Sequence, residues 1–274
     1  MRIRVVSMWF CEEQLARFFL KHYAWADEIS ILVDADTSDG TWEILREAHE
    51  AHGSNLRYRS FDFPHRLDDI LKARALTEAA NEPGCDWAIV ADADEFVFAW
   101  TFGEHIRSSN PVNATPVEGE EVDRLWFVRD VLEVIHTDIV WIPMWNVYRH
   151  RDDDDLDPSD PALPQRRHGS QEIHHVKPCI FRVGAGVELG PVSHSFTGPA
   201  NLREVGQDGL PSPLGAAHWQ YADPDLAVER LVTNRKNRLS PENLARGHGA
   251  HYLGLTEGSV RAECAQHLDD PRLF

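Results

Sequence analysis

Short apolar runs alternate with longer amphipathic segments through the first hundred residues of this 274-residue chain. The apolar runs predict β-strands at Ile3–Met8, Ile29–Val33, Leu56–Arg59 and Trp87–Ala91. Apolar residues at helical spacing between the runs predict helices at Glu12–Trp25, Trp42–Ala51 and Asp68–Ala80. Because a helix that joins two strands places them parallel in one sheet, this order predicts an α/β fold with a mostly parallel, Rossmann-like sheet flanked by helices.

The pattern changes after Phe98. Further strands are predicted at Trp126–Val128, Ile139–Val147 and Val176–Val183. Four consecutive aspartates and three prolines predict an exposed loop over 151–168, which is either a mobile lid or a plain surface excursion. Leucine spacing predicts helices from Asp223 onward. We expect one domain at 1–222 and a C-terminal helical appendage at 223–274. The domain would have two halves, 1–100 and 101–222.

Composition excludes several classes of protein. The chain carries 45 acidic and 27 basic residues, a formal charge of -18, which opposes binding to the phosphate backbone of nucleic acid. No apolar run approaches the roughly 18 residues of a transmembrane segment, and no secretory signal precedes the first strand, so we expect a cytoplasmic protein. The 4 cysteines stand far apart without a Cys-x-x-Cys pair, so we expect reduced thiols and no zinc knuckle.

Three acidic residues, Asp92, Asp94 and Glu95, follow the fourth apolar run. The carboxyl ends of parallel strands open onto the crevice where such sheets bind ligands. Two carboxylates one residue apart at that point can hold a hard divalent cation, which prefers oxygen ligands and often bridges to substrate phosphates. Asp92 and Asp94 therefore predict a metal and diphosphate site; the alternative is a solvated acidic turn.

A second acidic cluster follows the second apolar run, in the segment from Asp34 to Thr41. An aspartate at such a strand end can accept hydrogen bonds from a ribose or a base edge. The Ser-Asp-Gly-Thr turn at the end of this segment lets a helix begin over the crevice. Two acidic strand ends on one sheet fit a nucleotide held at one end and its metal-bound diphosphate at the other.

Two of the 15 histidines are candidate metal ligands. His194 and His218 each follow a glycine-containing segment and stand before an aromatic residue, about a hundred residues or more after Asp94. Neutral imidazole suits Mn²⁺ as well as zinc, so a late histidine can complete an aspartate site. We expect His218 to be the ligand, with His194 second; the alternative is that either histidine caps a turn.

Three segments resemble a known family: Val5–Glu13, Val33–Thr41 and the Asp-Ala-Asp-Glu-Phe sequence at 92–96. They are similar to family 2 glycosyltransferases with the type A fold, especially the bacterial branch with that signature. The resemblance covers residues 1 to about 100. It continues more weakly through Lys177–Arg182, Gly190–His194 and His218–Tyr221.

The resemblance implies an activity and a set of ligands. Such enzymes transfer a sugar from a nucleotide diphosphate donor, here most simply a UDP-sugar, with Mn²⁺ or Mg²⁺ as cofactor. The acceptor would be a saccharide or another hydroxyl compound, and the transfer would be inverting.

The resemblance also implies roles for individual residues. Asp34 would contact the nucleoside, Asp92 the ribose or the metal through water, and Asp94 the metal directly. Asp69 and Arg74 would lie near the nucleotide-sugar; the alternative for Arg74 is a surface cation. Many relatives have Arg-Asn-Glu where this chain has Phe-Cys-Glu at 10–12, which leaves the first nucleoside contact open.

An inverting transfer also needs a general base within hydrogen-bond reach of the acceptor hydroxyl. Glu188 lies roughly where related enzymes place that base, just before Gly190. Glu172 and His194 are rival candidates. A retaining mechanism would need none of the three in this role.

Two other functions fit parts of the sequence. Asp34, Asp36 and Thr37 match the Asp-x-Asp-x-Thr pattern of haloacid-dehalogenase-like phosphatases, with Asp34 as nucleophile, Lys72 balancing the phosphate, and Asp92 and Asp94 on Mg²⁺. The other alternative is a catalytically inactive sugar-binding domain. The aromatic second half is consistent with a sugar site, because tryptophan faces stack on sugar rings; the candidates are Trp141, Trp145 and Trp219.

Overall fold

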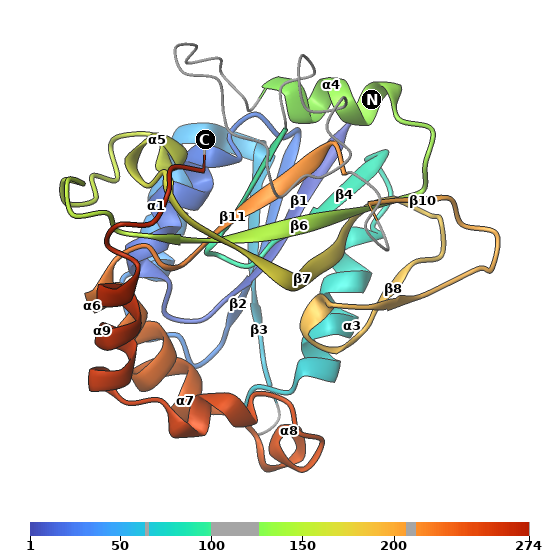
Figure 1. Cartoon of the computed structure of the whole chain (residues 1–274). Helices are drawn as coiled ribbons and strands as arrows, with labels where there is room; N and C mark the ends of the chain where they lie inside the picture. Colours follow the sequence, from blue (N-terminus) through green and yellow to red (C-terminus); the bar gives the residue numbers. More distant parts are fainter. Residues whose placement is uncertain (64–65, 100–125, 207–211, 274) are drawn as a thin grey trace.

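The computed structural model describes residues 1–63, 66–99, 126–206 and 212–273, and a large sheet runs through its centre (Figure 1). Within those residues nine strands join this sheet, in the order β3-β2-β1-β4-β7-β6-β11-β5, with β10 beside β6. The strands are β1 (Ile3–Trp9), β2 (Glu28–Asp34), β3 (Leu56–Phe61), β4 (Trp87–Val90), β5 (Glu95–Ala99), β6 (Ile139–Tyr148), β7 (His168–Arg182), β10 (Glu204–Val205) and β11 (Leu214–Tyr221).

The four strands predicted in the first hundred residues are all present, and β3, β2, β1 and β4 are parallel to one another. The predicted helices are present as α1 (Glu13–His22), α2 (Thr41–His52) and α3 (Asp69–Ala80). Arg4 bonds to the carbonyl of Ala79 in α3, whereas Trp9 packs edge-on against Phe19 in α1. Residues 4 and 9 of one strand point to opposite faces, so these helices cover both faces of the sheet. The α/β prediction is confirmed for this half.

The second half makes the sheet mixed. β7 runs antiparallel to both β4 and β6, β11 is parallel to β6, and β5 is antiparallel to β11. β5 begins directly after the acidic turn at 92–94 and forms the edge of the sheet opposite β3, so this turn connects the central strand β4 to that edge. Both acidic segments follow strands of the parallel half, β2 and β4.

The prediction of a strand at Trp126–Val128 is wrong, because the structure begins a helix there, α4 (Trp126–Val134). The buried residues Val128, Val131 and Leu132 stand three and four positions apart, which is helical spacing. A run of three apolar residues is consistent with a strand or a helix. The helical spacing of the buried residues that follow identifies this segment as a helix.

The acidic, proline-rich segment after β6 contains one short helix, α5 (Ala162–Gln165), and ends where β7 begins. Arg166 anchors it: this guanidinium is fully buried and donates to the carbonyls of Ala222 at 2.7 Å and Asp154 at 3.0 Å. The loop thus lies against the start of the C-terminal segment, and none of its described residues lines the pocket at the strand ends.

The C-terminal segment folds back over the strand ends (Figure 1). Its helices are α6 (Pro224–Val228), η5 (Glu229–Arg235), α7 (Lys236–Arg238), α8 (Pro241–Ala245), η6 (Ala250–Gly254) and α9 (Glu257–Gln266). The backbone N–H of Leu67 donates to the carbonyl of Arg238 at 3.1 Å, and Asn243 donates to the Asp69 carboxylate at 2.9 Å. Whether it counts as a separate unit beginning at 223 stays a prediction, but its helices pack directly on the parallel half.

Within the described part of the chain, no helix is both long enough and apolar enough to cross a bilayer. All four cysteines carry free thiols.

His22 should make the fold sensitive to acid. Its Nε2 donates to the carbonyl of Val97 at 2.9 Å, and burial lowers the pKa of His22 from 6.5 to about 4. The unfolded chain binds a proton near pH 6.5 while the folded His22 stays neutral, so stability falls as the pH drops through this window. We expect this group to remove about 3 kcal/mol from the free energy of unfolding between pH 7.5 and pH 4.

Urea unfolding of the parent and of His22→Gln at both pH values measures this contribution. The variant should lose about 3 kcal/mol less than the parent over the same interval. Identical losses would show that His22 does not titrate between the folded and unfolded states.

Candidate functional site

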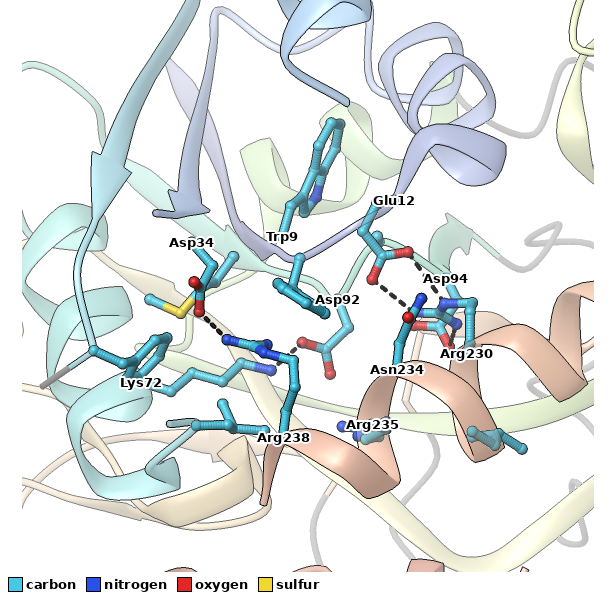
Figure 2. Close-up of a pocket in the computed structure, with 16 residues that line it drawn as sticks. Trp9, Glu12, Asp34, Lys72, Asp92, Asp94, Arg230, Asn234, Arg235 and Arg238 are labelled. Atoms are coloured by element: carbon cyan, nitrogen blue, oxygen red, sulfur yellow. Dashed lines mark hydrogen bonds and ion pairs between the residues drawn. The ribbon is translucent and has the colours of Figure 1, made fainter. Parts of the chain in front are cut away.

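A pocket opens at the carboxyl ends of β1, β2 and β4, where sheets of this kind bind ligands (Figure 2). It encloses a cavity of about 80 Å³, or about 680 Å³ when the part open to solvent is counted. Its charged lining residues are Glu12, Asp34, Asp92, Asp94, Lys72, Arg230, Arg235 and Arg238. Carboxylates and cations are equal in number here, so this pocket is electrically balanced inside an acidic chain.

Asp34 is the last residue of β2 and lies in the pocket. Its Oδ1 accepts a hydrogen bond of 2.9 Å from the backbone N–H of Asp36, and its Oδ2 accepts from the guanidinium of Arg238. That guanidinium also lies over the ring of Phe10, 3.5 Å from the centroid. The turn therefore orients Asp34, and a side chain 204 residues later neutralises it.

Glu12 enters the pocket from the turn between β1 and α1, and the Ser-Asp-Gly-Thr motif holds it there. The backbone N–H of Glu12 donates to the Thr41 hydroxyl at 2.8 Å, and that of Glu13 donates to the Asp39 carboxylate at 3.0 Å. The backbone N–H of Gly40 in turn donates to the Glu13 carboxylate at 2.9 Å. The motif therefore positions the first helix.

Glu12 is also the pocket carboxylate closest to titration at neutral pH. Burial raises the pKa of Glu12 to about 7, against the opposing charge of Arg230. Arg230 donates to both oxygens of Glu12, at 3.1 Å each. A carboxyl group with a pKa near 7 in a cleft can exchange protons during a reaction.

Asp92 follows β4 by two residues and lies between two lysines. Its oxygens are 2.6 Å from Lys72 Nζ and 3.4 Å from Lys177 Nζ. Burial raises the pKa of Asp92, but the two lysine charges outweigh it and hold that pKa well below its usual value. Glu95 supports the turn: it accepts from the backbone N–H of Asp92 at 3.0 Å and forms an ion pair with Lys177.

The register of β5 and β11 places His218 beside Asp94. His218 pairs with Glu95 across these strands, so its ring reaches the preceding residue. Its Nε2 lies 3.3 Å from Asp94 Oδ2, and its Nδ1 lies 2.9 Å from Asn146 Oδ1. Because an amide oxygen only accepts, Nδ1 donates to Asn146, which leaves Nε2 facing the Asp94 carboxylate.

Asp94 is almost fully buried and keeps its charge. Burial raises the pKa of Asp94, but Arg230 and His218 outweigh that effect and hold it well below the usual value. Arg230 donates to Oδ2, the same oxygen that faces His218. Asp94 is thus an ionised oxygen donor at pH 7.

The donor atoms of Asp94 and His218 fit one side of a divalent cation. They converge at 3.3 Å, and Asn146 fixes the imidazole as an outer-shell partner does in metal sites. No three His, Cys, Asp or Glu side chains form a complete cage in the described residues. Two protein ligands suffice where diphosphate oxygens and water complete the coordination. Asp92 lies in the same pocket and is paired with two lysines, and its role as a metal ligand stays a prediction.

His218 contacts Asp94 but does not line the pocket, and four other predicted site residues do not line it either. Asp69 is buried and bonded to Asn243, and Arg74 is 76% exposed and paired with Glu78. Glu188 is exposed on β8 (Glu188–Leu189), which pairs with β9 (Phe196–Thr197) beside α3. His194 follows the short helix between those strands. The roles given to these residues stay predictions, as does that of Glu172, whose side chain lies outside the described part.

The tryptophans predicted to stack on sugar are placed otherwise. Trp219 is fully buried and Trp145 nearly so, both in the core formed by Phe18, Phe96 and Phe98. Their faces are covered by protein, so stacking on a sugar is wrong for these two. Trp141 is half-buried; its Nε1 donates to Glu204 at 2.8 Å. Tryptophan is large and apolar, so its burial in a hydrophobic core is common.

Sequence reasoning missed the pocket residues of the C-terminal segment. Arg230, Asn234, Arg235 and Arg238 line the pocket beside the strand-end acids (Figure 2). One signal was available: a basic cluster at 230–238 in a strongly acidic chain. This pattern does not predict which acidic residues would form ion pairs with the cluster.

No protein-family model matches this chain, and no curated protein matches it. Among solved structures, it is similar to the mannosyltransferase PcManGT from Pyrobaculum calidifontis in complex with GDP-Man and Mn²⁺. That likeness has a TM-score of 0.40 and 16% sequence identity, and it covers 97% of this chain and 73% of the other. A likeness at this level does not establish a family, so the function must be inferred from the chemistry of the pocket.

Proposed function

We propose that this protein is a metal-dependent glycosyltransferase of the type A fold, related to family 2, that moves a sugar from a nucleotide diphosphate donor to a hydroxyl acceptor. One observation carries the proposal: the strand-end pocket holds Asp94, which contacts His218 beside it, together with basic side chains that suit a diphosphate. An acidic residue at a second strand end, Asp34, lies in the same pocket.

The chemistry of each side chain in and beside the pocket suits a different part of the donor. Asp34 can accept hydrogen bonds from the nucleoside, as strand-end acids do in nucleotide-binding sheets. Asp94 and His218 would hold the cation, which offsets the charge of the leaving diphosphate when it is bound. Lys72 and Arg235 lie close enough to the pocket to attract the same anion.

The donor and the stereochemistry follow the sequence expectations. We expect a UDP-sugar donor, a saccharide or other hydroxyl acceptor, and inversion with Glu188 as base. The phosphatase alternative needs Asp36 as an acid beside Asp34, and Asp36 is exposed and outside the pocket lining. The pocket therefore favours the transferase.

A thermal-shift panel tests this function. UDP, GDP, ADP and CDP are each added with Mn²⁺ or with EDTA. A nucleotide present at about 100 times its Kd stabilises the fold by roughly 2.7 kcal/mol, which corresponds to a Tm rise of about 5 to 10 °C for a chain of this size. We expect UDP with Mn²⁺ to give the largest rise and EDTA to remove most of it.

The same panel can overturn the proposal. If none of the four nucleotides raises the Tm with Mn²⁺, the pocket is not a nucleotide-sugar site. Hydrolysis of simple phosphate esters through a phosphoenzyme on Asp34 would instead support the phosphatase.

A further inference from the structure

One side of a continuous helix faces the pocket from above the strand ends. α6, η5 and α7 follow one another without a break from Pro224 to Arg238. Arg230, Asn234 and Arg238 stand four residues apart, and all three line the pocket. The middle part, η5, is a π-helix, a wider turn that often occurs at functional sites.

The arginines of this helical side are already paired with pocket acids. Arg230 joins Glu12 to Asp94, and Arg238 pairs with Asp34. These three acids belong to three different strand ends, so the helix neutralises the edge of the sheet. Figure 2 shows both guanidinium groups reaching across the pocket toward the acids.

Arg230 is hydrogen-bonded to Asp94 Oδ2, the oxygen that a cation would need as a ligand. Its Nη1 donates to Asp94 Oδ2, and His218 Nε2 lies 3.3 Å from that same atom. A cation held between Asp94 and His218 would compete with the guanidinium for Oδ2. Arg230 therefore acts as the counterion of Asp94 in the structure described here.

Asn234 adds an independent sign of a ligand. Its Nδ2 is buried and has no hydrogen-bond partner among the residues that the structure describes. A buried donor without an acceptor is costly and uncommon, and an anionic oxygen in the pocket would satisfy it.

We propose that Arg230, Asn234 and Arg238 are the diphosphate-binding side chains, and that nucleotide and cation enter by exchange of counterions. The diphosphate takes the two arginines and accepts from Asn234, and Asp94, released by Arg230, takes the cation. The diphosphate of a nucleotide-sugar has two negative charges and the cation has two positive charges, so their joint entry leaves the net charge of the pocket unchanged. This inference rests on the proposed function.

The exchange couples the two ligands. A cation alone must displace Arg230 from Asp94 with no other anion for the guanidinium to bind. A nucleoside diphosphate supplies that anion, so each ligand strengthens the binding of the other by the same factor.

The test measures the two ligands separately in the full chain. Binding of Mn²⁺ alone is followed by the loss of the free-ion signal in electron paramagnetic resonance, and binding of UDP and of GDP by calorimetry at saturating Mn²⁺. We expect Arg230→Gln to bind Mn²⁺ alone about tenfold more tightly and the nucleotide about 10- to 100-fold more weakly. If Arg230 only supported the fold, Arg230→Gln would change the affinities for Mn²⁺ and for the nucleotide in the same direction.

Two further variants separate the contributions. Arg238→Gln removes the partner of Asp34 but not of Asp94, so it should weaken nucleotide binding and leave Mn²⁺ alone unchanged. Arg246→Gln removes a half-exposed arginine that pairs with Asp68 outside the pocket, and it should change neither. If Arg230→Gln does not fold, Arg230→Lys should show smaller changes of the same two signs, because a single ammonium cannot join both acids.

The outcomes distinguish this inference from the function beneath it. If the parent binds UDP or GDP with Mn²⁺ but the Arg230 variants weaken both ligands or neither, the counterion exchange is wrong and the transferase stands. If the parent binds neither nucleotide, both proposals fail.

Discussion

Asp94→Asn should abolish sugar transfer while leaving the fold intact. The change removes the ionised oxygen that faces His218, so the cation loses its charged protein ligand. Loss of the charge stabilisation that such a cation supplies corresponds to at least about a 1000-fold lower rate. Arg230 keeps its pair with Glu12, so the buried guanidinium is not left alone and the Tm should change by only a few degrees.

Product formation from the donor found in the nucleotide panel, Mn²⁺ binding and thermal melting are measured together for this variant. Asp36→Asn is the matched control, because Asp36 is exposed, follows the same kind of strand end and does not line the pocket. The control should keep the parent rate. Full transfer by Asp94→Asn in EDTA would contradict a metal-dependent reaction.

Lys177→Met should destabilise the fold by about 3 to 5 kcal/mol, because it leaves the buried Glu95 carboxylate without its cation. Lys177 is 8% exposed and pairs with Glu95, which is 3% exposed, and with Asp92. Burial lowers the pKa of Lys177, but Glu95 and Asp92 outweigh it and raise the pKa above its usual value, so the lysine is charged at every accessible pH. Denaturant unfolding at pH 7.5 measures the loss.

Two comparisons identify the cause of that loss. Arg203→Met removes an ion pair with Asp138 in which the arginine is 62% exposed, and it should cost much less, because an exposed ion pair is screened by solvent. Adding Glu95→Gln to Lys177→Met removes the unpaired buried charge and should recover part of the stability. A loss from Lys177→Met as small as that from Arg203→Met would show that the pair is solvated.

The first hundred residues could be predicted because their signals are local. A run such as Trp87–Val90 is buried on both faces, so all its residues are apolar, and the alternation with helices specifies a parallel sheet. Parallel strands bring their carboxyl ends to one edge, which placed Asp34, Asp92 and Asp94 in one pocket. The error at Trp126–Val128 came from the shortness of the run.

The partners of those acids could not be predicted, because they come from distant parts of the chain. His218 reaches Asp94 through the register of β5 and β11, and a shift of one residue would turn it to the other face of the sheet. Lys177 reaches Asp92 because β7 runs antiparallel between β4 and β6. No residue near either position in the sequence encodes that pairing.

The sequence by itself determined the parallel half of the sheet and the acids at its edge, since strand length, burial and turn chemistry act between neighbours in the chain. Only the tertiary structure decided which cations meet those acids. Arg230 and Arg238 lie 136 and 204 residues after their partners Asp94 and Asp34, and the fold brings them together by packing a helix over the strand ends. A buried carboxylate requires a counter-charge, but any of many basic residues could have supplied it, so the choice belongs to the packing of the whole chain.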